Sequence, residues 1–256
     1  RRSVSTSDSD LWAQSARWWQ ATFTGGTDPE YVEQILPLVS QHLPRSGRVL
    51  DVGTGEGQVA RLAAGPRAVV GVDPTWPQLE EARRRGGGPL YARATAASLP
   101  FAAASFDAAV ACLVLEHLDE LEETVAEVGR VLRPGGRFLL LMNHPLLQAP
   151  GSGWIDDHIL GEQYWRIGPY LVEDSSVEEV DKGVFVPFVH RPLSRYVNLL
   201  VDHGMLVTRM DEPAPPAGFL ARAEEYAGAA TIPRLLFLLA EKLRDRRDDV
   251  TMEARL

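Results

Sequence analysis

The sequence predicts an α/β fold with a seven-stranded, mostly parallel sheet, helices on both faces and an inserted cap or lid. Two observations lead to this prediction. From residue 48 onward, short apolar runs alternate with helical patterns, which is typical of parallel strands joined by helices. Between residues 144 and 182 the alternation stops, and Gly, Pro, aromatic and acidic residues take over. We interpret that stretch as the inserted cap.

Turn and capping residues place the elements in order. Asp28 followed by Pro29 is typical of a helix start, and Gly204 of a helix end. Residues 133–136 (Arg-Pro-Gly-Gly) predict a turn before a strand. The strands are expected at residues 48–52, 68–72, 90–93, 106–112, 137–142, 206–210 and 234–240. The helices are expected at residues 11–23, 28–44, 57–64, 77–85, 119–132 and 192–203.

This order divides the chain into four parts. Residues 1–10 are polar and Ser-rich, so we expect a flexible tail. Residues 11–144 form the cofactor-binding core, which opens with an N-terminal lid helix containing Trp12, Trp18 and Trp19 at helical spacing. Residues 145–182 are the substrate cap, and residues 183–256 complete the sheet.

Composition limits the classes of partner. A chain of 256 residues fits one large domain, and its net charge of −9 disfavours nucleic acid, which binds through Lys and Arg. The single cysteine permits neither an intrachain disulfide nor a multi-thiolate zinc site, which favours the reducing cytoplasm. The longest apolar runs are far shorter than the roughly 20 residues of a membrane span. We expect a small molecule as partner, with no nucleic acid and no membrane; monomer and homodimer both stay open.

The sharpest motif is VLDVGTGEG at residues 49–57. An apolar strand ends in Asp51, and Gly53, Gly55 and Gly57 follow at alternate positions, where the missing side chains let backbone amides approach a ligand. Asp73 ends the next apolar run, about 20 residues beyond the glycines, where a carboxylate accepts hydrogen bonds from ribose in nucleotide-binding folds. The loop lacks the third glycine of a dinucleotide fingerprint, because Gln58 stands at that position.

With two further segments, the motif resembles the class I S-adenosylmethionine-dependent methyltransferases, in particular the group of ubiquinone and menaquinone biosynthesis methyltransferases. The segments are SLPFAAASFDAAVACLVLEHL at residues 98–118 and LRPGGRFLLL at residues 132–141. The resemblance is close over residues 49–145 and looser at the flanks. It implies a Rossmann-like fold, S-adenosylmethionine as cofactor and S-adenosylhomocysteine as product.

The resemblance also implies a cofactor site. Strand ends and the glycine loop would hold the methionine part, Asp73 the ribose hydroxyls, and the neighbouring loops the adenine. One departure concerns Thr95, which stands where the family commonly has Asp, so a carboxylate contact to the adenine amino group is in doubt. The implied residues are Asp51, Gly53, Thr54, Gly55, Gly57, Gln58, Asp73, Pro74, Thr75, Thr95, Ala96, Cys112 and Leu113.

Methyl transfer to a hydroxyl requires a base, and three histidines are candidates. His144 follows the strand at residues 137–142 at its carboxyl end, where open parallel sheets bind ligands, and we take it as the leading candidate. His117 follows the preceding strand, and His190 joins the cap to the next helix. For each of them a local structural role is the alternative.

The cap supplies four aromatic residues, Trp154, Tyr164, Trp165 and Tyr170, among several carboxylates. We interpret them as substrate-binding residues for an acceptor with apolar and hydroxyl surfaces, such as a sugar derivative, phenol or polyketide. Packing of the cap onto the sheet is the alternative for each. Asp156, Asp157 and His158 are adjacent in sequence and therefore poorly placed to share one metal ion, so we expect no metal site.

The sequence thus predicts an O-methyltransferase that acts on a small molecule by in-line transfer with a histidine base. A C- or N-methyltransferase without a general base is the main alternative. A nicotinamide-dependent oxidoreductase and a protein that binds the cofactor without catalysis are less favoured.

Overall fold

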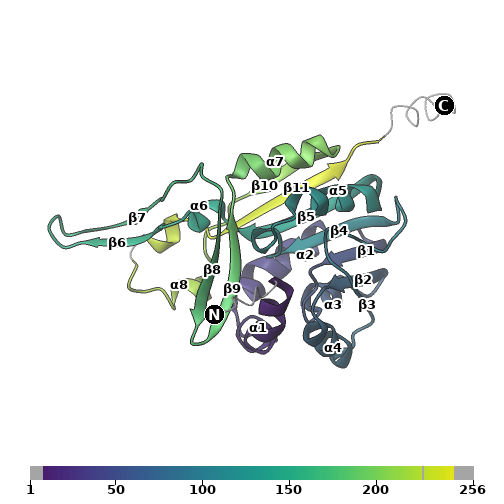
Figure 1. Cartoon of the computed structure of the whole chain (residues 1–256), viewed down its shortest axis with the longest axis horizontal. Helices are drawn as coiled ribbons and strands as arrows, with labels where there is room; N and C mark the ends of the chain where they lie inside the picture. The colour runs from purple at the N-terminus through teal and green to yellow at the C-terminus, as the bar shows by residue number, and fades with distance from the viewer. Residues whose placement is uncertain (1–7, 227, 245–256) are drawn as a thin grey trace, which may run out of the picture.

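The computed structural model describes residues 8–226 and 228–244. Its centre is a seven-stranded sheet with strand order β10-β11-β5-β4-β1-β2-β3 (Figure 1). Five neighbouring strands run parallel, and β11 is antiparallel to both of its neighbours. The predicted fold class is therefore confirmed. The sheet strands are β1 (Gly47–Val52), β2 (Arg67–Asp73), β3 (Leu90–Arg93), β4 (Phe106–Cys112), β5 (Leu132–Asn143), β10 (Met205–Asp211) and β11 (Leu235–Lys242).

Alternating apolar side chains give the sheet two buried faces. In β4, Ala109 and Ala111 pack into one core, whereas Ala108, Val110 and Cys112 pack into the other. Side chains of α5 and α7 complete the first core, and those of η1, α2 and α3 complete the second. Because successive residues of a strand point to opposite faces, these continuous apolar runs fit only a sheet covered on both sides.

The helices lie close to their predicted positions. α4 begins with Pro77 in its first turn and ends at Gly86, which has a φ of +66°. α1 includes residues 8–10, which the sequence placed in the tail; residues 1–7 lie outside the described residues. The helical elements are α1 (Asp8–Thr22), the π-helical turn η1 (Tyr31–Ile35), α2 (Leu36–His42), α3 (Gln58–Ala63), α4 (Trp76–Arg85), the 3-10 turn η2 (Leu115–His117), α5 (Leu121–Val131), α6 (Pro145–Gln148), α7 (Leu193–Asp202), α8 (Ala217–Leu220) and the 3-10 turn η3 (Ala229–Thr231).

Residues 133–136, which we expected as a turn before the strand, lie inside β5. Leu132 already pairs with Phe106 of β4, and the register then shifts so that Arg137 pairs with Ala108. The extra residues form a bulge that needs glycine, because a Cβ on Gly136 would lie 2.8 Å from the Arg133 carbonyl oxygen.

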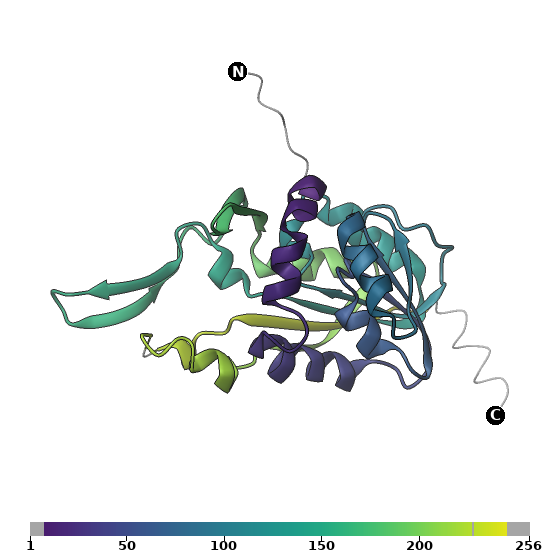
Figure 2. The ribbon, with the colours of Figure 1, turned by 90° about the horizontal axis from the view of Figure 1, so that it is seen from below.

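The predicted cap consists of two separate β-hairpins rather than one lid. β6 (Gly153–Asp157) pairs with β7 (Glu162–Arg166), and this hairpin projects away from the sheet (Figures 1 and 2). β8 (Asp174–Asp181) pairs with β9 (Val184–His190), which contacts α1. The predicted boundary after residue 182 falls in the turn of this second hairpin, because its apolar strand β9 belongs with the polar β8.

Candidate active site

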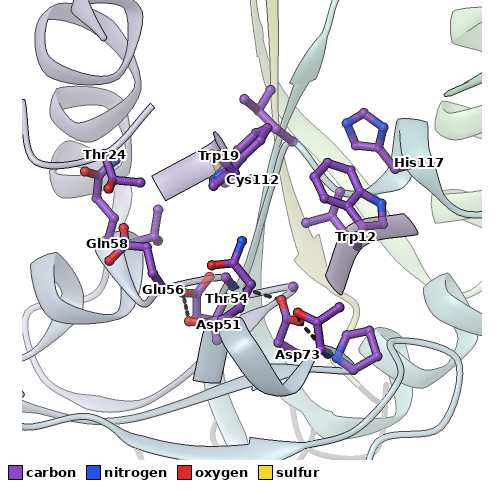
Figure 3. A pocket seen from close by; sticks show the side chains of 18 of the residues that line it. Trp12, Trp19, Thr24, Asp51, Thr54, Glu56, Gln58, Asp73, Cys112 and His117 are labelled. Atoms are coloured by element: carbon purple, nitrogen blue, oxygen red, sulfur yellow. Dashed lines mark hydrogen bonds between the residues drawn. The ribbon is translucent and has the colours of Figure 1, made fainter. Parts of the chain in front are cut away.

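A cavity opens at the carboxyl ends of β1, β2 and β4, beneath α1 (Figure 3). Ten of the predicted cofactor residues line it: Asp51, Gly53, Thr54, Gly55, Gln58, Asp73, Pro74, Thr75, Cys112 and Leu113. Gly57, Thr95 and Ala96 are absent from its wall, and Thr95 is exposed. We call this space the first cavity.

The glycine loop brings backbone into the floor of the first cavity. Gly53 has a φ of +67°, and a Cβ there would lie 2.5 Å from Cγ2 of Val114. Glycine is therefore required by both conformation and space. Thr54 donates its hydroxyl to Asp51 Oδ2 at 2.6 Å, a contact made possible by Gly71 on β2, where a Cβ would overlap the Thr54 side chain.

Two buried carboxylates stand at the strand ends. Burial raises the pKa of Asp51 to about 7 although the Thr54 hydrogen bond opposes the shift. Asp73 Oδ2 accepts from the Gly55 amide at 3.0 Å, and Oδ1 accepts from the Thr75 amide at 2.8 Å. Burial also raises the pKa of Asp73. Asp51 is held by Thr54 of its own loop, whereas Asp73 is held by Gly55 of the glycine loop and by Thr75 of its own loop. Both carboxylates line the cavity with remaining acceptor capacity.

α1 forms the roof of the first cavity and is held at both of its sides. On the glycine-loop side, Gln20 donates to Gln78 of α4 at 2.8 Å. On the opposite side, Ser15 donates to the Phe185 carbonyl of β9 at 3.1 Å, and Trp18 Nε1 donates to Asp181 Oδ2 at 3.1 Å. Trp12 and Trp19 of α1 line the first cavity. These contacts join elements far apart in the sequence.

A second cavity adjoins the first between α1, η1 and β9. Trp19, Leu113 and His117 line both cavities. The wall of the second cavity combines aromatic rings with polar side chains, a composition found in small-molecule sites. Its other lining residues include Trp18, Phe23, Asp28, Glu30, Gln34, Ile35, Asn143, Gln148, Phe188 and Arg234.

His117 stands at the junction of the two cavities. Its Nδ1 lies 2.7 Å from the Pro187 carbonyl oxygen, and since a carbonyl only accepts, Nδ1 carries the proton. Nε2 is then the lone-pair nitrogen of a neutral ring. The ring packs edge-on against Trp12, with centroids 4.9 Å apart, and against Phe188 at 4.8 Å. Burial lowers the pKa of His117 to about 4, which keeps the ring neutral at pH 7.

His144, our leading base candidate from the sequence, occupies a structural position. Its Nδ1 accepts from the Leu146 amide at 3.1 Å and caps α6. Its Nε2 lies 2.8 Å from Glu212 Oε1 and donates to it. Both ring nitrogens are therefore engaged, and the residue lines neither cavity. This arrangement leaves His144 no lone pair for a substrate.

His190 is also displaced from the site. Its Nε2 donates to the Tyr170 carbonyl at 2.8 Å, and its Nδ1 is buried without a partner among the described residues. His190 lines neither cavity. Of the three histidines, only His117 reaches the space where a substrate can bind.

The four cap aromatics lie outside both cavities as well. Trp154 stacks on Tyr226, with ring centroids 5.2 Å apart, and packs edge-on against Trp165. Tyr170 accepts a hydrogen bond from the Leu193 amide at 2.9 Å, and Tyr164 is exposed on the hairpin. Trp154, Trp165 and Tyr170 thus contact neighbouring protein groups, and none of the four aromatic residues lines either cavity.

Sequence reasoning missed several wall residues. Tyr31, whose hydroxyl is 4.0 Å from Cys112 Sγ, lines the first cavity from η1, and Phe188 lines the second from β9. The spacing of Trp12 and Trp19 indicated the lid helix but not which cavity wall each ring would form.

The acidic segment at the tip of the projecting hairpin makes local contacts. Asp157 Oδ1 accepts from the amides of Ile159 and Leu160 and closes the turn. Across residues 8–226 and 228–244, no group of three or more His, Cys, Asp or Glu side chains is arranged to hold a metal ion. Nor does any helix in that part of the chain have the length and apolar character to cross a membrane.

The sheet order, the glycine loop and the strand-end carboxylates together define a nucleotide-cofactor fold. Residues 50–140 match the methyltransferase domain family. A solved S-adenosylmethionine-dependent methyltransferase from Mesorhizobium loti has a TM-score of 0.69 and 30% identity, covering 80% of this chain and 96% of that one. The chain therefore belongs to the class I S-adenosylmethionine-dependent methyltransferases, and S-adenosylmethionine is the cofactor of this family.

Two curated relatives differ in the atom that they methylate. A ubiquinone/menaquinone biosynthesis C-methyltransferase of Desulfotalea psychrophila is 41% identical over 107 residues, which is 40% of this chain and 44% of the relative. An O-methyltransferase of Aspergillus sclerotiorum is 33% identical over 133 residues, 48% of this chain and 50% of the relative. The chain thus spans about half the length of these relatives.

Proposed function

We propose that this chain transfers a methyl group from S-adenosylmethionine in the first cavity to a hydroxyl of a small molecule in the second. The observation that supports this most directly is the position of His117. It lines both cavities, and its Nδ1 hydrogen bond to the Pro187 carbonyl leaves the Nε2 lone pair as the basic nitrogen. A hydroxyl is the acceptor that requires such a base.

The hydrogen-bonding groups that line the first cavity match the polar parts of the cofactor. Asp73 and the amides around it suit the ribose hydroxyls, and Pro74 with Thr75 suits the adenine side. Asp51 and the glycine loop suit the methionine end, where an ionised Asp51 would pair with the amino group. The resemblance assigned Thr95 and Ala96 to the adenine. Neither residue lines the first cavity, so the adenine would contact them only if it extended beyond this cavity.

The chain's own groups carry the remaining chemistry. When bound, the cofactor supplies an electrophilic sulfonium methyl group, and its C–S bond electrons remain on sulfur. The two cavities hold the acceptor oxygen in line with that bond, a positioning effect of roughly 7 to 11 kcal/mol. His117 Nε2 takes the hydroxyl proton as the oxygen–methyl bond forms, and later releases it to water. The aromatic rings around His117 exclude competing water.

Methyl transfer to carbon or nitrogen is the second candidate. The Desulfotalea relative is named as a C-methyltransferase, and such an acceptor needs no base at His117. Under that alternative, the buried neutral imidazole would serve only as a hydrogen-bond acceptor.

Two measurements test the proposal. Calorimetric titration should show binding of S-adenosylhomocysteine and none of NAD. Labelled methyl transfer should then be followed into a panel of phenols, sugars and polyketides, with mass identification of the product. Cofactor binding without methyl transfer to any compound of the panel would indicate a non-catalytic cofactor-binding protein. A labelled methyl group on carbon or nitrogen would replace the O-methyltransferase assignment.

The Asp73→Ala variant tests the cofactor site. Removal of the ribose-binding carboxylate should weaken S-adenosylhomocysteine binding at least about tenfold, since hydrogen bonds to charged groups are among the strongest. Asp202→Ala is the control, because Asp202 is exposed at the end of α7. Equal affinities of the two variants would refute the ribose assignment.

A further inference from the structure

The second cavity carries unbalanced negative charge. Its wall contains two carboxylates, Asp28 and Glu30, and one guanidinium, Arg234. Arg234 binds Glu30 through two hydrogen bonds, of 2.8 Å and 3.4 Å, and stacks over the Phe219 ring at 4.1 Å. His117 is neutral. The charge on Asp28 is therefore left without a partner in the wall.

Asp28 itself is half-buried at the start of η1. Its Oδ1 accepts from the Glu30 amide at a long 3.4 Å, and among the described residues no Lys, Arg or His forms an ion pair with it. Burial and the Glu30 charge raise the pKa of Asp28, whereas backbone hydrogen bonds from Glu30 and Tyr31, followed by the charge of Arg222, oppose the shift. A helix cap uses part of this carboxylate and leaves further acceptor capacity.

Gln34, one turn along the same helix, is a second acceptor without a donor. Its Nε2 donates to the Ala214 carbonyl at 2.7 Å, which fixes the orientation of the amide. Its Oε1 is buried and has no hydrogen-bond partner among the described residues. Gln34 is only 8% exposed and lines the second cavity. A buried acceptor left unpaired is costly, so a ligand that donates here is favoured.

Aromatic rings complete this wall. Trp18, Trp19 and Phe23 form a cluster in which the Trp19 and Phe23 centroids are 4.5 Å apart, and all three line the second cavity. Aromatic faces beside a carboxylate are the setting in which proteins bind organic ammonium groups. The Asp28 carboxylate, the Gln34 amide oxygen and the aromatic rings thus all favour a ligand with an organic ammonium group.

We infer that the methyl acceptor carries a protonated amine, held by Asp28 and Gln34, and an apolar body packed on Trp18, Trp19 and Phe23. This inference rests on the proposed function and narrows its substrate class to amino-substituted hydroxy compounds. The amine anchors the molecule, and a separate hydroxyl reaches His117. A protonated amine has no lone pair and is not itself the methylated group.

The test measures binding to the full chain saturated with S-adenosylhomocysteine. The probes are arylalkylamines and their alcohol isosteres, with tyramine and tyrosol as the first pair, titrated by calorimetry at low ionic strength. Asp28→Asn removes the charge yet retains a good helix cap. Asp202→Asn makes the same change on the exposed end of α7, away from both cavities.

We expect the amine to bind about tenfold more tightly than its isostere, because its hydrogen bonds are charge-assisted. Asp28→Asn should remove this preference, and Asp202→Asn should retain it. The inference is overturned if no amine of the set exceeds its isostere, or if the preference survives in Asp28→Asn. Normal S-adenosylhomocysteine binding in either case leaves the proposed function standing.

A different role for Asp28 would be to face the cofactor's sulfonium. In that case Asp28→Asn would weaken S-adenosylmethionine but not S-adenosylhomocysteine, and this result would also overturn the inference. Unchanged affinity for both cofactor forms is the result expected of a residue that lines the second cavity and not the first.

Discussion

The loops after β4 and β5 each place a buried histidine at the same edge of the sheet, yet the two side chains are available for different chemistry. After β4, His117 uses one ring nitrogen for the Pro187 carbonyl. After β5, His144 uses both, one for the Leu146 amide and one for Glu212. The comparison teaches that partners, rather than residue type or edge position, decide whether a histidine can serve as a base.

The largest expected effect separates these two histidines by turnover. His117→Ala should lower methyl transfer to a hydroxyl acceptor by about 10²-fold to 10⁴-fold, the range of general-base catalysis. S-adenosylhomocysteine affinity, measured by calorimetry, should change little because the strand-end carboxylates remain. His144→Ala should retain turnover. Loss of turnover in His144→Ala alone would reverse the comparison.

The next effect concerns Glu116, which is buried beside His117 and accepts from the Asn143 amide at 2.9 Å. Burial raises its pKa to about 7. Below pH 4.5, the ordinary pKa of Glu116, the carboxyl is protonated in both the folded and the unfolded chain. Above this pH it ionises first in the unfolded chain, because the folded chain would have to ionise a buried group. Stability should therefore fall between about pH 4.5 and pH 7, by about 3 kcal/mol in total.

Glu116→Gln, which retains the acceptor for Asn143, should remove this pH dependence. Urea unfolding at pH 5 and pH 8 measures this. The free energy of unfolding should fall from pH 5 to pH 8 in the parent, and it should fall less in Glu116→Gln. Parallel pH curves for the two proteins would contradict a raised pKa.

A smaller effect is expected on the β5 side. His144→Ala removes the cap of α6 and should lower the free energy of unfolding by about 1 kcal/mol, a typical value for a lost cap. Thermal or urea unfolding measures this directly. An unchanged stability would show that the contacts of His144 with Leu146 and Glu212 contribute little.

The smallest effect on catalysis is expected for Trp154→Ala on the projecting hairpin. The variant loses the ring stacked on Tyr226, so amide exchange in residues 153–166 should accelerate. Turnover and the acceptor Michaelis constant should stay within about twofold of the parent, because Trp154 lines neither cavity. An acceptor Michaelis constant raised tenfold would return the hairpin to the substrate site.

The sheet and the strand-end residues could be predicted because the information is local. Asp51 and Asp73 lie at the carboxyl ends of neighbouring parallel strands, and parallel strands end at one edge of the sheet. The role of each histidine could not be predicted, because its hydrogen-bond partner is distant in the sequence. Pro187 lies 70 residues from His117, and Glu212 lies 68 residues from His144. The position of the cap aromatics outside both cavities could not be predicted for a related reason, since an aromatic that packs on Tyr226 has the same sequence pattern as one that lines a cavity.

The position of α1 has a kinetic consequence. Trp12 and Trp19 belong to the same helix; Trp12 lines the first cavity, and Trp19 lines both. Any movement of α1 that breaks the Ser15–Phe185 and Gln20–Gln78 contacts therefore opens both spaces together. Cofactor exchange and acceptor exchange would then share one gate, and a disulfide joining positions 15 and 185 should slow both release rates by the same factor.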